Sequence, residues 1–102
     1  MTDNENIPFI QERLPIAERL CALAEEATEL AQAALKLRRV YDTTSPTIVT
    51  YEEALNNLFE EIADVRVCIR CLGLDSDHHV ELYREIEASK MERWAKRLKA
   101  KV

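Results

Sequence analysis

The chain has little of what tight turns and sheets require. Its 102 residues include one glycine and three prolines, so few positions suit the short turns that join neighbouring β-strands. Ala, Leu, Glu, Lys and Arg dominate instead, and these residues favour helices. The apolar fraction of 47% and the charged fraction of 32% are typical of one small globular domain. We therefore predict a single all-α domain that spans residues 1–102.

The chain also lacks a long apolar run, a surplus of positive charge and an even number of cysteines. No apolar run is long enough to span a membrane, and residues 1–6 are polar and acidic, unlike a secretion signal. The net charge of −5 does not favour binding to nucleic acid. Cys68 and Cys71 form a C-x-x-C pattern inside an apolar helix, without a second ligand pair. We interpret them as buried structural thiols of a protein in the reducing cytoplasm.

Apolar residues recur at alternating intervals of three and four positions along three segments, which predicts three long helices. The first helix spans about residues 15–40. The second begins at Thr50, where Glu53 completes a capping box, and ends near Gly73, the only glycine. The third helix spans about residues 77–99 and has a thinner apolar face.

The remaining segments precede or connect these helices. We expect residues 1–7 to form a flexible tail and residues 8–14 to form a short helical turn, ended or kinked at Pro15. Residues 41–49 are rich in turn and loop residues. Because the apolar stripes are wide, three helices leave apolar surface exposed in one chain. We therefore predict a helical bundle of three main helices whose four-helix-type core is completed by oligomerisation, in a homodimer or a homotetramer.

Two pairs of acidic residues lie in the middle of the first two helices. Glu26 and Glu29 form one pair, and Glu61 and Asp64 form the other. Residues three apart on a helix are neighbours on one face, so each pair holds two like charges close together. Each acid directly precedes a residue of the apolar stripe, so antiparallel helices packed along these stripes can bring all four carboxylates to one point. A divalent cation would make such an arrangement favourable.

The residues alone leave a second interpretation of these acids open. A single E-x-x-E pattern on a helix is common and is typical of a solvated face. Two pairs in the same phase on consecutive helices favour a metal site more strongly than either pair alone. Three cations near the end of the first helix, Lys36, Arg38 and Arg39, are interpreted as complements to the helix dipole.

The combination of E-x-x-E on one helix with E-x-x-D on the next resembles the all-α nucleoside triphosphate pyrophosphatase superfamily. That group includes MazG-like proteins, dimeric dUTPases and phosphoribosyl-ATP pyrophosphohydrolase. The resemblance extends from about Leu20 to Arg97 and rests on the segments LAEEATELAQAALK, LFEEIADVRVC and KMERWAKR. The connection between the two acidic motifs is somewhat longer here than is usual in the family.

The resemblance implies a metal-dependent hydrolase. Mg²⁺, or Mn²⁺ in its place, would be bound by the four paired acids Glu26, Glu29, Glu61 and Asp64. Water would attack the α-phosphorus of a nucleoside triphosphate, giving a nucleoside monophosphate and pyrophosphate. We expect Glu26 to be a catalytic residue as well as a metal ligand. We also expect Glu25 to act in catalysis by orienting or deprotonating that water, and Glu60 is the alternative for this role.

The resemblance also implies that Lys90 and Arg93, in the third helix, bind the phosphate groups of the substrate. The alternative is that both are ordinary surface cations near a helix end, and Arg97 is a weaker third candidate. His78 and His79 do not have the E-x-x-H spacing of di-iron bundles, and we interpret them as surface residues.

The expected function is therefore hydrolysis of a (deoxy)nucleoside triphosphate in cleaning of the nucleotide pool. Two alternatives stay open. One is a phosphoribosyl-ATP pyrophosphohydrolase of histidine synthesis. The other is a non-catalytic helical oligomerisation or regulatory module that retains the acidic residues.

Overall fold

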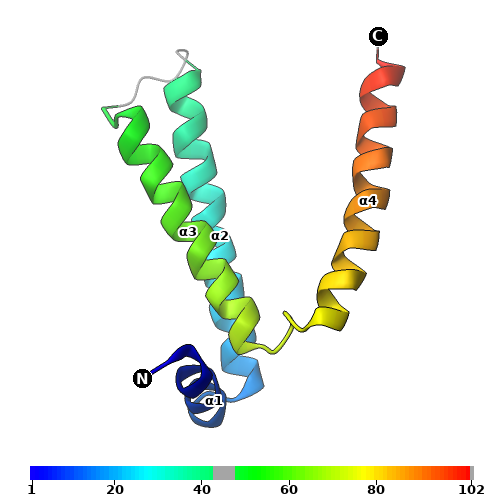
Figure 1. Cartoon of the computed structure of the whole chain (residues 1–102). Coiled ribbons are helices and arrows are strands. Elements are labelled where there is room, and N and C mark those ends of the chain that lie inside the picture. Colours follow the sequence, from blue (N-terminus) through cyan, green and yellow to red (C-terminus); the bar gives the residue numbers. More distant parts are fainter. Residues whose placement is uncertain (43–47, 102) are drawn as a thin grey trace. The chain divides into compact units, whose positions relative to one another are not determined.

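The computed structural model describes residues 1–42 and 48–101. Within these residues it contains no strands, which confirms the all-α prediction, and it contains four helices (Figure 1): α1 (Asp3–Arg13), α2 (Ile16–Tyr41), α3 (Tyr51–Cys71) and α4 (Asp77–Ala100). The chain divides into two compact units, Met1–Leu72 and Gly73–Val102. Among the described helices, none is long and apolar enough to cross a membrane.

In the first unit, α2 and α3 run antiparallel and lie side by side (Figure 1). The buried apolar residues of this unit are small: Ala33 of α2, and Ala54 and Cys71 of α3. Small side chains let two helices approach closely, so functional groups that flank the seam are brought near one another. The interface between α2 and α3 is therefore the feature that positions the site described below.

The ends of α3 agree with the predicted signals. The Thr50 hydroxyl accepts a hydrogen bond from the Glu53 backbone N–H (3.2 Å), and the Thr50 N–H donates to the Glu53 carboxylate (3.4 Å). This is the predicted capping box, and it satisfies two backbone donors that a helix start leaves unpaired. After α3, Gly73 has a φ of 72°, a left-handed conformation that favours glycine.

The start of the chain differs from the prediction. We expected a tail over residues 1–7, followed by a helical turn from Pro8, but α1 begins at Asp3. Thr2 and Glu5 form a capping box, with the Thr2 N–H donating to the Glu5 carboxylate (3.3 Å), so the helix begins before the proline. The predicted break at Pro15 is confirmed, because this residue is the N-cap of α2.

Side chains from α1 and α2 fix the C-terminal end of α3. The backbone carbonyl of Cys71 accepts hydrogen bonds from Gln11 Nε2 (3.2 Å) and Arg19 Nη1 (2.9 Å). The last carbonyls of a helix have no partner within the helix, so these two donors satisfy a group that would otherwise be unpaired. Arg70 also forms an ion pair with Asp3 at 3.1 Å.

The other ends of α2 and α3 are connected by the segment that the sequence predicts to be a loop. Residues 43–47 of that segment lie outside the described residues. On either side of it, the rings of Tyr41 and Tyr51 meet edge to face with centroids 5.7 Å apart. This contact holds the end of α2 near the beginning of α3.

The second unit consists of α4 and the residues that precede it. The Ser76 hydroxyl caps the helix by accepting a hydrogen bond from the His79 N–H (3.4 Å), and the Tyr83 hydroxyl donates to the Leu74 carbonyl. The helix is described throughout and has no buried residue; Met91 and Trp94 are each 63% exposed. Its bounds agree with the predicted third helix to within one or two residues, as expected for helix ends.

Candidate metal site

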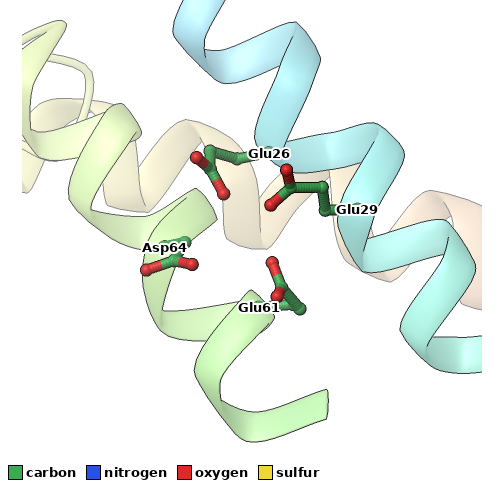
Figure 2. Close-up of side chains that lie close together, drawn as sticks. All are labelled: Glu26, Glu29, Glu61 and Asp64. Carbon is green, nitrogen blue, oxygen red and sulfur yellow. The ribbon is translucent and has the colours of Figure 1, made fainter. Parts of the chain in front are cut away.

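The two acidic pairs converge between α2 and α3. Figure 2 shows that the side chains of Glu26 and Glu29, from α2, point toward those of Glu61 and Asp64, from α3. One carboxylate oxygen from each residue lies within 4.8 Å of the other three. The predicted convergence is therefore confirmed, and its cause is the shared position of both pairs beside the packing seam of antiparallel helices.

One member of each pair is partly buried. Glu26 and Glu61 are half-buried, whereas Glu29 and Asp64 are exposed. The Oε2 atoms of Glu26 and Glu61 are inaccessible to solvent and have no hydrogen-bond partner in the described part of the chain. Buried polar atoms in folded proteins nearly always have a partner. Among the described residues, only a shared proton with Glu29 would give Glu26 and Glu61 such a partner, and a bound cation would be the alternative.

The electrostatics of the cluster favour a proton or a cation. Burial raises the pKa of Glu26 above its ordinary value, and the negative charges of Glu29 and Asp64 raise it further. Burial also raises the pKa of Glu61, and the same two neighbours again add to the effect. The ionised forms of Glu26 and Glu61 are therefore disfavoured unless a cation binds beside them.

The donor set fits a hard divalent cation. All four groups offer carboxylate oxygens, the ligands that Mg²⁺ and Mn²⁺ prefer. Oxygens about 2.1 Å from a Mg²⁺ ion lie at most about 4.2 Å from one another, slightly less than the 4.8 Å spread of the cluster, so the side chains would move closer together around one ion. Cys68 is not part of the group of possible ligand atoms, and burial and the charge of Glu26 raise the pKa of its thiol.

A pocket of about 590 Å³ adjoins the cluster between α2 and α3. Glu29 and Glu61 belong both to the cluster and to the pocket lining, and two cations of α2, Lys36 and Arg39, also line it. The position of these cations near the end of a helix predicts only that they complement the helix dipole. The available signal was their spacing, because Lys36 and Arg39 follow Glu29 by seven and ten residues and so lie on the same face of the helix.

The other predicted site residues lie outside the cluster. Glu25 is exposed on α2, and its carboxylate accepts a weak hydrogen bond from the Cys21 thiol at 3.8 Å. Glu60 is exposed on α3, and its charge contributes to the raised pKa of Glu61. Lys90 and Arg93 are exposed on α4, in the second unit. Their roles in binding and catalysis stay predictions.

Comparisons with protein-family models, with curated proteins and with solved structures find no match to this chain. The all-α fold and the carboxylate cluster therefore rest on the residues and coordinates described above. The resemblance to the nucleoside triphosphate pyrophosphatases rests on the motifs in the sequence.

Proposed function

We propose that this protein is a Mg²⁺-dependent nucleoside triphosphate pyrophosphohydrolase. The observation that supports this proposal most directly is the convergence of four carboxylates, two of which have buried oxygens without partners. Four like charges held this close together repel one another, and the repulsion is strongest for the two buried oxygens. A divalent cation offsets it, and a triphosphate, which is itself an anion, needs such a cation to approach the cluster at all.

The clustered acids and Glu25, which lies outside the cluster, would have distinct parts in the reaction. Glu26, Glu29, Glu61 and Asp64 would hold the cation, which when bound would supply Lewis-acid chemistry to a phosphate group and to a water molecule. Glu25, the exposed neighbour of Glu26 on α2, accepts the proton of the attacking water. The water oxygen forms a bond to the α-phosphorus, and the bond to the bridging oxygen breaks, so that its electron pair leaves with pyrophosphate.

The resemblance assigns phosphate binding to Lys90 and Arg93 of α4. Their side chains would donate charge-assisted hydrogen bonds to phosphate oxygens and so offset the charge of the leaving pyrophosphate. Both side chains are exposed and available for such contacts.

Oligomerisation is part of the same proposal. Several large apolar side chains are more than half exposed, among them Phe59, Trp94 and Leu98. A homodimer or homotetramer would cover such surface, in a protein that cleans the nucleotide pool of the cytoplasm.

The proposal is tested by incubating the protein with Mg²⁺ and a panel of nucleoside triphosphates, with phosphoribosyl-ATP included. We expect release of pyrophosphate from at least one member of the panel. Release of orthophosphate would contradict attack at the α-phosphorus. Binding of Mg²⁺ without turnover of any member would favour the non-catalytic module.

A further inference from the structure

The pocket beside the carboxylate cluster has a lining that changes sign along its length. On α2, the residues Glu29, Gln32, Lys36 and Arg39 follow one another at intervals of three, four and three positions and all line the pocket. Such intervals place side chains on one face of a helix. From α3, Asn57 and Glu61 complete the polar lining. The pocket is therefore acidic at the cluster, has amide groups along its walls and is basic toward the end of α2.

The two cations are in reach of a ligand that starts at the carboxylates. Lys36 and Arg39 follow Glu29 by about 10 Å and 15 Å along the helix axis. Long side chains on a helix lean back toward its N-terminus, which here is the direction of the cluster. An extended anion with one end at the carboxylates would therefore have its other end beside these cations.

Neither cation has a partner within the described residues. Lys36 and Arg39 form no ion pair or hydrogen bond there, whereas Arg19 of the same helix donates to two backbone carbonyls. Lys36 is partly buried and Arg39 is exposed, and both line the pocket. Positive groups without internal partners in a concave wall favour an anionic ligand.

We propose that Lys36 and Arg39 bind the β- and γ-phosphates of the substrate, with the amides of Gln32 and Asn57 as additional hydrogen-bond donors. This inference rests on the proposed function, because it takes the α-phosphate to lie at the cation held by Glu29 and Glu61. A di- or triphosphate fits the lining because it carries charged oxygens along its whole length. The pocket volume of about 590 Å³ lies within the usual range for small-molecule sites.

The proposal gives these cations a part in the chemistry of the leaving group. When the bond between the α-phosphorus and the bridging oxygen breaks, the electron pair stays on pyrophosphate. Positive groups already placed beside the β- and γ-phosphates stabilise that charge without reorganisation. Removal of Lys36 or Arg39 should therefore weaken the binding of a polyphosphate, although neither residue is one of the metal ligands.

Arg38 provides a matched control. It lies between the two cations in sequence, it is exposed, and it does not line the pocket. If all three cations served only to complement the helix dipole, Arg38 would be equivalent to its neighbours. Lys36→Gln, Arg39→Gln and Arg38→Gln each remove one positive charge from the same end of α2.

The test is a calorimetric titration of the full chain with inorganic tripolyphosphate in the presence of Mg²⁺. We expect Lys36→Gln and Arg39→Gln each to weaken binding about tenfold or more, the effect of losing a hydrogen bond to a charged group. Arg38→Gln should change the affinity by less than about twofold, because an exposed charge outside the pocket is screened. Circular dichroism checks that the helices of each variant are intact.

Different results test this inference and the proposed function. Equal weakening in all three variants, or weakening only in Lys90→Gln, would overturn the assignment to Lys36 and Arg39. Failure of the wild type to bind Mg²⁺ would overturn the proposed function, and the titration is then repeated without metal. If tripolyphosphate binds without metal and the binding depends on Lys36 and Arg39, the result would support the pocket as an anion site. If tripolyphosphate does not bind without metal, the assignment of an anion site to the pocket would be overturned.

Discussion

The charged residues of α2 and α3 are arranged very differently from those of α4. In α4, charges of opposite sign lie in solvent, and Glu92 and Lys96 form an exposed ion pair at 4.0 Å. Between α2 and α3, four charges of the same sign lie within 4.8 Å, and two of their oxygens are buried. An exposed pair between opposite charges contributes little to stability, whereas a buried group of like charges opposes folding until a cation arrives. The difference indicates that the first unit holds a group of acids that could bind a divalent ion, whereas the charges of α4 are those of a solvated helix surface.

The largest expected effect is on turnover. Glu61→Gln should lower kcat by roughly a hundredfold to a thousandfold, because one charged contact to the reaction centre is lost. Glu52→Gln is the matched control, since Glu52 is an exposed acid on the same helix that lies outside the cluster. Pyrophosphate release measures both. Similar turnover in the two variants would show that Glu61 of the cluster contributes no more to the reaction than the exposed Glu52.

The next largest effect is on stability in the presence of metal. A cation at a hundredfold excess over its Kd stabilises the folded state by about 2.7 kcal/mol, which raises the Tm of a domain of this size by roughly 10 °C. Thermal unfolding with Mg²⁺ and then with a chelator measures this shift. A variant with both Glu26→Gln and Glu61→Gln should show almost no shift, and a shift as large as that of the wild type would place the cation elsewhere.

The cluster should also make the metal-free protein sensitive to pH. Because the pKa values of Glu26 and Glu61 are raised in the folded state, the folded state holds protons that the unfolded state releases. Stability should therefore fall as the pH rises from the ordinary carboxyl pKa of 4.5 through the raised values. Chemical denaturation at a series of pH values tests this. The same decline in the variant with Gln at both positions would show that other groups cause it.

The smallest effect should come from the ion pair of α4. Lys96→Gln removes a pair between exposed side chains, which contributes about 0.5 kcal/mol or less. Its Tm should stay close to that of the wild type, and so should its response to Mg²⁺. A large change in either quantity would mean that α4 has a part in the site that its exposed charges do not indicate.

Much of this arrangement could be predicted from sequence, because helical periodicity fixes which residues share a face. The spacing of Glu26 with Glu29 and of Glu61 with Asp64, together with their phase relative to the apolar stripes, predicts the cluster that the structure contains. The position of Lys36 in the lining of a pocket could not be predicted in this way. Periodicity places it on the face of Glu29, but only the packing of α3 against α2 shows that a pocket opens there.

The start of α1 was missed for a different reason. Residues 1–7 are polar, and composition alone indicated a tail. The local hydrogen bonds of Thr2 with Glu5 outweigh that signal, and contacts of α1 with α3, such as the one between Gln11 and the Cys71 carbonyl, hold the helix in place. Long-range contacts of this kind cannot be predicted from the periodicity of a short segment.

Direct measurement of Mn²⁺ binding tests the central claim most closely. In an electron paramagnetic resonance titration, the wild type should remove free Mn²⁺ from solution, and Mg²⁺ should displace it. Glu61→Gln should bind Mn²⁺ about tenfold more weakly or worse, and Glu52→Gln should bind as the wild type does. A free Mn²⁺ signal that the wild-type protein leaves unchanged would contradict the claim that these four carboxylates hold a divalent cation.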